Sequence, residues 1–364
     1  MRKAKQILTV AVLGLMLLGG MVLHLATPDQ EFSRAERRRL HQLPELKAEA
    51  LLSGEYAADL EAYLQDRSPM RDKLRTLKSF WSYGILHQRD VNGVFMAEGT
   101  ASKLSPPLDP KQVQRFVDKM NGLHERYFPD SQITCVVVPD KNYYLTDGTS
   151  YPRFAYDELY AMVEEGLPWA EHLDIRVSLS AEDYYTTDAH WRQERLMALR
   201  DLLAEAMELS LPGWDTYRET VLPGFYGVYH GQAALPLPPE DLVYLENDVT
   251  DRAVVTGPEL KGEQSVYAPE RFAGLDGYDV FLHGPQAILT IEDPLAETDR
   301  ELIIFRDSFG SSLAPLLLPG YQKITMIDIR YVVPDLLEQF VDFHGQEVMI
   351  LYSTTMINAA GALK

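Results

Sequence analysis

The chain has 364 residues, of which 46% are hydrophobic and 24% are charged, a composition that excludes a mainly disordered protein. Its 54 acidic and 34 basic side chains give a formal net charge of −20, which repels phosphate backbones and excludes nucleic-acid binding as the main role. A single cysteine, Cys135, excludes an intrachain disulfide and any multi-cysteine metal site.

The N-terminal segment predicts a membrane anchor. Three basic side chains in residues 1–6 precede an uncharged apolar stretch at residues 7–26, close to the ~20 residues that a helix needs to cross a bilayer. The basic flank predicts that residues 1–6 form a cytoplasmic tail and that the rest of the chain lies outside the cytoplasm, in a single-pass cell-membrane protein. A cleaved signal peptide is the alternative, but His24-Leu25-Ala26 fits a cleavage site poorly.

Residues 27–88 predict a helical stalk or cap near the membrane. The segment is charged, has a basic cluster at residues 34–39, and carries apolar residues at helical spacing. The sequence DRSPMRD at residues 66–72 breaks the pattern, and Pro69 suits the first turn of a further helix that we expect to end near Leu86.

Residues 89–364 predict one α/β domain. After the hairpin signal Asn92-Gly93, short apolar runs alternate with helical patterns, which predicts a mainly parallel sheet. We expect strands at residues 133–138, 175–179, 302–305, 324–329 and 348–352, and helices at residues 110–127, 154–167 and 192–209. A stretch rich in Pro and Gly at about 211–278 predicts an irregular, partly β insertion.

A serine follows one of these strands. The run of residues 302–313 (LIIFRDSFGSSL) predicts an apolar strand that stops at Asp307-Ser308 and passes into a helix. Backbone N–H groups and the positive end of the helix dipole at such a junction suit a developing oxyanion, which makes Ser308 a candidate nucleophile. The alternative is that Ser308 or Asp307 only caps the helix.

A possible base lies in the run Thr187-Asp188-Ala189-His190-Trp191. A serine nucleophile needs an imidazole base, and the imidazole needs a carboxylate to fix its tautomer. Asp188 and His190 could supply both groups from one loop, although a helix start with a capping Asp and an incidental His explains the same letters. Of the other histidines, His230 and His283 are less favoured candidates for the base.

Several motifs together resemble the DHHW protein family, which is related to the SGNH-hydrolase-like proteins of alginate O-acetylation. The resemblance covers most of the chain after the anchor and rests on residues 32–38 (FSRAERR), 59–72, 187–191, and 307–315 followed by 328–331 (DIRY). It implies a three-layer SGNH-hydrolase-like sandwich and a Ser-His-Asp triad made of Ser308, His190 and Asp188. The order Asp, His, Ser is permuted relative to ordinary SGNH esterases, but geometry defines a triad.

Two positions depart from the family pattern. The first His of the DHHW signature is Ala189 here, as in the Asp-x-His-Trp form of the alginate proteins, and residues 281–286 (FLHGPQ) stand where we expect a Gly-Gly-Asn-like turn. If that asparagine normally donates to the oxyanion, Arg330 or Tyr331 would have to complement the Ser308 N–H.

Lys141 and Tyr144 follow the strand predicted at residues 133–138. The resemblance implies that they help to bind substrate, and a turn with a solvated lysine is the alternative. The sequence holds no Gly-Asn-His or Gly-His partner for a metal site and no glycine-rich phosphate loop, so we predict no metal and no cofactor.

The resulting hypothesis is an extracytoplasmic O-acetyltransferase or esterase that acts on a cell-surface or secreted polysaccharide. Activity is expected to fall at acid pH as His190 takes up a proton. The alternatives are a catalytically degenerate glycan-binding or scaffold protein, and a partner of a membrane-bound O-acyltransferase that works through its anchor and stalk.

Overall fold

The structure, a computed structural model, describes residues 2–33, 36–235 and 237–364. Residue 1 of the predicted tail and residues 34 and 35 of the basic cluster and the FSRAERR motif lie outside the described residues. The chain divides into two compact units. The first comprises Met1–Asn92 and His230–Pro236, and the second comprises Gly93–Tyr229 and Leu237–Lys364.

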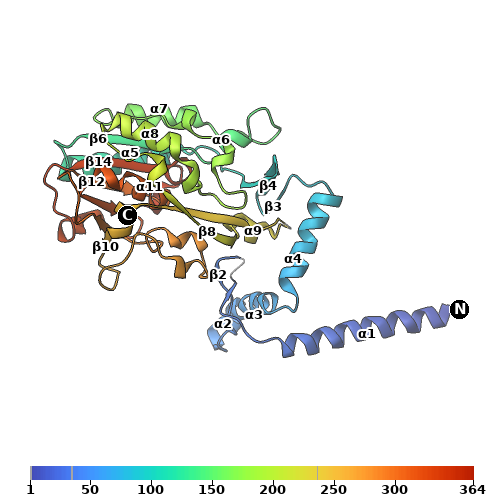
Figure 1. Ribbon diagram of the computed structural model, residues 1–364. Coiled ribbons are helices and arrows are strands. Elements are labelled where there is room, and N and C mark those ends of the chain that lie inside the picture. The colour runs from blue at the N-terminus through green and yellow to red at the C-terminus, as the bar shows by residue number, and fades with distance from the viewer. Residues whose placement is uncertain (1, 34–35, 236) are drawn as a thin grey trace. The chain divides into compact units, whose positions relative to one another are not determined.

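The first unit contains a long apolar helix followed by short helices and short strands (Figure 1). Its elements are α1 (Arg2–Ala26), β1 (Phe32–Ser33), β2 (Arg38–Arg39), α2 (Ala48–Ser53), α3 (Glu55–Asp66), α4 (Arg71–Phe80) and β3 (Asp90–Val91). A π-helical turn at Trp81–Ile85 continues α4 and ends one residue before the expected end. In α1, the 22 residues Lys5–Ala26 are long and apolar enough to cross a membrane, a property that anchors and signal sequences share.

Ion pairs hold the extended segments of the first unit to its helices. Arg38 donates to both carboxylate oxygens of Asp66, at 2.9 and 2.5 Å, and the backbone N–H of His41 donates to the same carboxylate at 3.0 Å. Although burial opposes the shift, these hydrogen bonds lower the pKa of Asp66. The carboxylate therefore stays ionised at any physiological pH.

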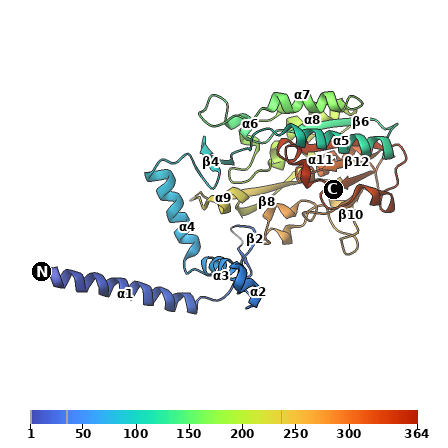
Figure 2. The ribbon, with the colours of Figure 1, turned by 180° about the vertical axis from the view of Figure 1, so that it is seen from behind.

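The second unit is a mixed α/β structure (Figures 1 and 2). Its strands are β4 (Val94–Ala97), β5 (Thr100–Lys103), β6 (Ile133–Val138), β7 (Glu171–His172), β8 (Arg218–Phe225), β9 (Glu240–Glu246), β10 (Val254–Thr256), β11 (Ile288–Glu292), β12 (Glu301–Arg306), β13 (Lys323–Ile327) and β14 (Glu347–Ser353). Its helices are α5 (Pro110–Tyr127), α6 (Asn142–Leu145), α7 (Tyr156–Gly166), α8 (Met197–Ala206), α9 (Val228–Ala233, of which the first two residues belong to this unit), α10 (Asp248–Arg252), α11 (Gly310–Leu317) and α12 (Thr354–Ile357).

Seven strands form the main sheet in the order β10-β11-β13-β12-β14-β6-β7. The five strands from β13 to β7 are parallel, and β11 and β10 extend the β13 edge antiparallel. The prediction of a mainly parallel sheet is therefore confirmed. The carboxyl ends of β12, β14 and β6 meet at one edge, where loops of parallel sheets commonly bind ligands.

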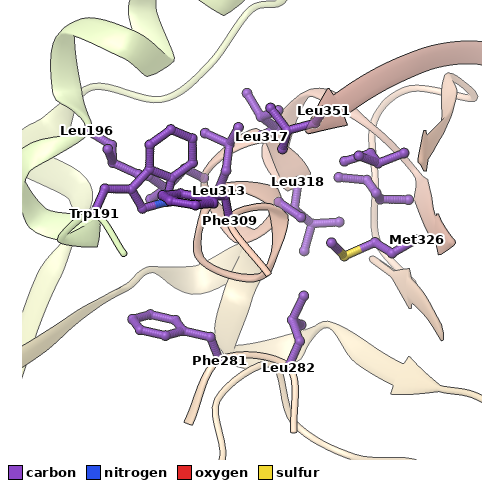
Figure 3. Close-up of a cluster of buried hydrophobic side chains, with 14 of the residues drawn as sticks. Trp191, Leu196, Phe281, Leu282, Phe309, Leu313, Leu317, Leu318, Met326 and Leu351 are labelled. Atoms are coloured by element: carbon purple, nitrogen blue, oxygen red, sulfur yellow. The ribbon is translucent and has the colours of Figure 1, made fainter. Parts of the chain in front are cut away.

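Helices pack on both faces of this sheet. Side chains of α5 and α7 pack with alternate residues of β6, β12 and β14 on one face, and side chains of α8 and α11 pack with the other set. Both faces of β6 are thus covered, which explains its unbroken run ITCVVV. Figure 3 shows one part of this core, in which Leu313 and Leu317 of α11 lie near Trp191 and Phe309.

One predicted strand is wrong. Residues 175–179 form a 3-10 turn at Arg176–Ser178, and the edge strand β7 lies earlier, at Glu171–His172. The reason is local, because Asp174 accepts hydrogen bonds from the backbone N–H of Arg176 at 3.0 Å and from its Nε at 2.8 Å. Such an Asx turn bends the chain where the apolar spacing alone indicates a strand.

Candidate active site

The turn after β12 carries Ser308. Asp307 fixes this turn, because its Oδ1 accepts from the backbone N–H of Phe309 at 3.1 Å and its Oδ2 accepts from the backbone N–H of Ser353 at 2.8 Å. Gly310 opens α11, and a Cβ there would lie 3.0 Å from the Cβ of Arg306, so a larger residue would crowd the end of β12. Ser308 consequently lies between the carboxyl end of a strand and the start of a helix.

The structure brings Ser308, His190 and Asp188 together in a hydrogen-bonded chain. His190 Nε2 is 2.7 Å from Ser308 Oγ, and His190 Nδ1 is 2.6 Å from Asp188 Oδ1. Because a carboxylate only accepts hydrogen bonds, Nδ1 carries the imidazole proton, and Nε2 is left to accept from the serine hydroxyl. The Asp188 side chain is fully buried, whereas the His190 side chain is 14% exposed. A buried carboxylate, an oriented imidazole and a hydroxyl are the parts that proton transfer from a serine requires.

Glu240 at the start of β9 holds the loop that precedes Asp188. Its carboxylate accepts from the backbone N–H groups of Thr186 at 2.7 Å and Thr187 at 2.8 Å, and from the Thr187 hydroxyl at 2.9 Å. Gly227 packs on the other side, where a Cβ would lie 2.2 Å from the Thr187 carbonyl carbon. The backbone N–H of Val228 then donates to Asp188 Oδ2 at 2.8 Å. The Asp188 carboxylate is thus positioned by residues 40 to 52 positions away in the sequence.

Lys141 also holds this loop, through a hydrogen bond to its backbone. Its side chain is 1% exposed, its Nζ donates to the carbonyl of Tyr185 at 2.9 Å, and the ring of Tyr229 lies 5.0 Å from Nζ. Burial lowers the pKa of Lys141 to about 7, although the nearby carboxylates of Asp188 and Glu240 oppose the shift. The structure therefore places Lys141 inside the protein as a support of the loop rather than on a surface open to substrate.

Tyr278 stacks on the candidate base. The rings of Tyr278 and His190 have centroids 4.0 Å apart and are inclined by 10°, and the Tyr278 hydroxyl donates to Ser312 Oγ at 2.7 Å. Trp191 Nε1 donates to the same Ser312 oxygen at 2.8 Å. Burial raises the pKa of Tyr278, so its phenol stays neutral and presents the electron-rich ring face to the imidazole.

Tyr278 and Glu240 were not identified from the sequence. Both lie in or at the edge of the region predicted as an irregular insertion, and neither has a local motif that indicates contact with residues 186–190. Asp276 and Gly277 before Tyr278 are a turn signal, but a turn signal does not tell which ring a side chain will meet.

Two further predicted site residues, Arg330 and Tyr331, have no hydrogen bond to the triad among the described residues. The guanidinium of Arg330 donates to Asp328 from Nε at 2.8 Å and from Nη2 at 2.5 Å; although burial opposes it, this contact raises the pKa of Arg330. Tyr331 is 47% exposed. Within the described part of the chain, neither side chain has a hydrogen bond to Ser308, and the Ser308 backbone N–H has no acceptor.

Tyr144 lies away from the triad. Its hydroxyl donates to the carbonyl of Arg176 at 3.0 Å, and its ring is near those of Tyr143 and Tyr184. The side chain therefore ties α6 to the 3-10 turn after β7.

Residues 281–286, where the sequence departs from the family pattern, include a left-handed stretch of backbone. Leu282, His283 and Gly284 have φ angles of 51°, 64° and 78°. Two of these left-handed residues carry a Cβ, at a cost of about 1–3 kcal/mol each. His283 was a less favoured candidate for the base. Its Nε2 lies 2.8 Å from the carbonyl oxygen of Ser265, so this nitrogen is engaged with the backbone and not with Ser308.

No group of three or more His, Cys, Asp or Glu residues could hold an ion in residues 2–33, 36–235 and 237–364. Cys135 is buried in β6, and burial raises the pKa of its thiol to about 12.

Among known proteins, only solved structures match this chain, and what they share with it is the fold. No protein-family model matches the sequence, and no curated protein matches it. The structure is similar to a DHHW family protein from Eubacterium siraeum, with 21% identity over 75% of this chain and 94% of that chain and a TM-score of 0.62. It is also similar to PatB1 from Bacillus cereus, with 14% identity over 72% of this chain and 96% of that chain and a TM-score of 0.56, and to PatB1 with a sulfonyl adduct at the same TM-score. These similarities establish a shared fold.

Proposed function

We propose that this chain is an extracytoplasmic serine O-acyltransferase or esterase with an SGNH-hydrolase-like fold, which handles acetyl esters of a cell-surface or secreted polysaccharide. In this proposal Ser308 is the nucleophile, His190 the base and Asp188 the orienting carboxylate. The observation that carries it is the hydrogen-bonded chain of 2.7 and 2.6 Å through the two nitrogens of His190. The shared fold with a DHHW family protein supports the SGNH-hydrolase-like architecture, and the resemblance of the motifs to the proteins of alginate O-acetylation supports the substrate class.

The first half-reaction forms an acyl-enzyme. As Ser308 Oγ attacks the acetyl carbonyl carbon, its proton moves to His190 Nε2, and Asp188 stabilises the imidazolium through Nδ1. The tetrahedral intermediate collapses with loss of the donor's leaving group, which takes the proton from Nε2. Ser308 then carries an acetyl ester.

The second half-reaction regenerates the serine. A sugar hydroxyl gives its proton to His190 Nε2 and attacks the acetyl carbon, and Ser308 Oγ leaves and recovers that proton. With water in place of the sugar the same steps give acetate, and the protein is an esterase. Neither half-reaction consumes a cofactor.

The oxyanion of each intermediate needs donors. The Ser308 backbone N–H is the first, and Arg330 and Tyr331 are candidates for a second if their side chains reorient when substrate binds. Losing one oxyanion donor costs about 100- to 1000-fold in rate, so a single donor would give a slow enzyme.

The proposed organisation places this chemistry outside the cytoplasm. Residues 1–6 form a tail, residues 7–26 an anchor, residues 27–88 a stalk, and residues 89–364 the catalytic domain with its insertion near 211–278. The length and composition of α1 support the anchor. A membrane-bound O-acyltransferase is a proposed partner.

The test uses the full-length protein in detergent micelles with p-nitrophenyl acetate. We expect a burst of p-nitrophenol and a mass increase of one acetyl group on Ser308. Ser308→Ala and His190→Ala should lose both, whereas Ser53→Ala and His344→Ala, at exposed positions, should retain them. Equal turnover in Ser308→Ala and wild type would falsify the proposal, and absence of turnover with retained polysaccharide binding would indicate a degenerate binding protein.

A further inference from the structure

A cavity of about 220 Å³ opens at the edge of the sheet beside the candidate triad. Its walls come from the segment after β5, the residues after β6, and α12 after β14, with Phe154 and Tyr229 completing it. No sequence motif indicated this cavity, and the triad residues do not line it.

Both walls connect to the triad through short hydrogen-bonded paths. On one side, Asp307 Oδ2 accepts from the Ser353 N–H at 2.8 Å, and the next residue, Thr354, lines the cavity. On the other side, the backbone N–H of Tyr229 donates to the carbonyl of Thr187 at 2.9 Å, next to Asp188. The cavity therefore lies one strand along the same sheet edge from Ser308, where a substrate longer than one acyl group would extend.

Asn142 leaves an acceptor without a donor in the wall. It is 5% exposed, and its amide NH2 donates to the carbonyl of Lys103 at 2.6 Å and to Ser105 Oγ at 2.8 Å. Those bonds fix the orientation of the amide, and within the described residues its Oδ1 has no partner. Asn142 Oδ1 is shielded from solvent, and a buried acceptor is costly unless it is paired, so a small shift of the wall that lets a ligand hydroxyl reach Oδ1 is favoured.

A network around Asp140 keeps this wall rigid. Asp140 accepts from the Tyr156 hydroxyl and from the backbone N–H of Asn142, each at 2.9 Å, and from the Thr354 hydroxyl at 2.9 Å. Burial raises the pKa of Asp140 against these hydrogen bonds. The carboxylate thus cross-links the ends of β6 and β14 and leaves Asn142 Oδ1 as the unpaired group.

The remaining wall is apolar and includes Leu104, Pro106 and Phe154. A cavity that combines an apolar face with a few fixed polar groups matches a sugar ring, which has apolar faces and hydroxyls at its rim. Its volume, equal to about seven waters at roughly 30 Å³ each, accommodates one such ring.

We propose that this cavity is a subsite for one sugar unit of the polysaccharide, with Asn142 Oδ1 accepting a hydroxyl of the ring, while a neighbouring unit presents its hydroxyl or ester to Ser308. The subsite deepens the proposed function and rests on it for its biological role. Binding of sugar in the cavity is nevertheless measurable without turnover.

The experiment measures binding of chitotetraose and cellotetraose to the full-length protein in detergent micelles by isothermal titration calorimetry. Ala359→Phe fills the cavity from its mouth, and Thr355→Trp blocks it from an exposed position, so neither removes a hydrogen bond of the wall. Ala362→Phe is the matched control, because it adds the same ring three residues away at an exposed position that does not line the cavity.

We expect at least one tetrasaccharide to bind, with a Kd that is tenfold or more higher in Ala359→Phe and Thr355→Trp and unchanged in Ala362→Phe. Unchanged binding in both cavity variants, or no binding of either sugar to the wild type, overturns the subsite. Ser308→Ala separates the two proposals: it should bind sugar like the wild type and fail to hydrolyse p-nitrophenyl acetate. If Ser308→Ala hydrolyses the ester normally, the proposed function fails. The subsite then stands or fails on the binding measured for the wild type and the two cavity variants.

Discussion

The two halves of the candidate triad are held in different ways. The turn that carries Ser308 is fixed by Asp307, which bonds a neighbour in the chain and one residue of the adjacent strand β14. The loop that carries Asp188 and His190 instead depends on Glu240, Lys141 and the backbone of Val228, none of which is close to it in sequence. The serine is thus placed by the sheet, and the base is placed by tertiary contacts.

This difference predicts where substitutions far from the reacting atoms will matter. A change near Ser308 has to disturb the sheet, which the core protects on both faces. A change in the supports of the Asp188 loop can misplace the imidazole while the fold survives. Because a small displacement of a base lowers the rate steeply, the loop supports are the sensitive part of the site.

The largest effect is expected from Asp188→Asn. The amide keeps the shape but can donate to His190 Nδ1, which favours the tautomer with a proton on Nε2 and prevents that atom from accepting the serine proton. We expect kcat for p-nitrophenyl acetate to fall about 10³- to 10⁴-fold. Asp157→Asn, in an exposed ion pair with Arg176, is the control and should keep wild-type activity. A loss of less than tenfold would contradict the assigned role.

Glu240→Gln tests the loop support directly. One amide oxygen replaces two carboxylate oxygens that take three donors, so at least one buried donor loses its partner at a cost of about 1–3 kcal/mol. If that cost appears in catalysis, kcat/KM falls roughly 5- to 150-fold. Hydrogen exchange at Thr186 and Thr187 should accelerate. Glu246→Gln, on the same strand, is the control and should change neither kcat/KM nor hydrogen exchange. If the amides of Thr186 and Thr187 exchange equally slowly in Glu240→Gln and the wild type, Glu240 does not hold this loop.

Tyr278 contacts both halves of the site: its ring stacks on His190, and its hydroxyl is hydrogen-bonded to Ser312 of α11, the helix that follows Ser308. Tyr278→Leu removes the stacked ring, worth about 0.5–1.5 kcal/mol, so the rate should fall roughly 2- to 13-fold. Tyr278→Phe keeps the ring and should keep more of the rate than Tyr278→Leu. Equal rates in Tyr278→Leu and the wild type would rule out a role for the stacked ring.

The smallest effect concerns stability and pH. Lys141 has a pKa of about 7 in the folded protein, whereas an unfolded lysine titrates near ~10.4. Between these values the unfolded state binds more protons, so this group makes the free energy of unfolding rise with pH, by about 1 kcal/mol from pH 7 to pH 8. The difference in unfolding free energy between wild type and Lys141→Met, measured in urea, should shift by that amount in favour of the wild type. A pH-independent difference would show that the amine is not neutralised by burial.

The sequence predicted those parts of the fold that depend on local periodicity. The helix at residues 110–127 and the strand at residues 133–138 match α5 and β6, because a capping Asp109, a proline at the first turn and a continuous β-branched run are local signals. It failed at residues 175–179, where a side-chain hydrogen bond of Asp174 outweighs apolar spacing. The antiparallel strands β10 and β11 were not predicted individually: β10 is a three-residue edge strand inside the stretch predicted as irregular, and β11 is a five-residue strand that pairs with β10 and β13.

By itself, then, the sequence named the three residues of the candidate triad, because a serine after a buried strand and an Asp-x-His pair are recognisable as chemistry. Whether those groups meet was decided by tertiary structure alone: Ser308 and His190 are 118 residues apart, and their 2.7 Å contact depends on where the loop is held. Tyr278, Glu240 and the cavity beside Asn142 have the same origin, since each arises where segments distant in sequence pack together, and packing between distant segments leaves no periodic signal in either one.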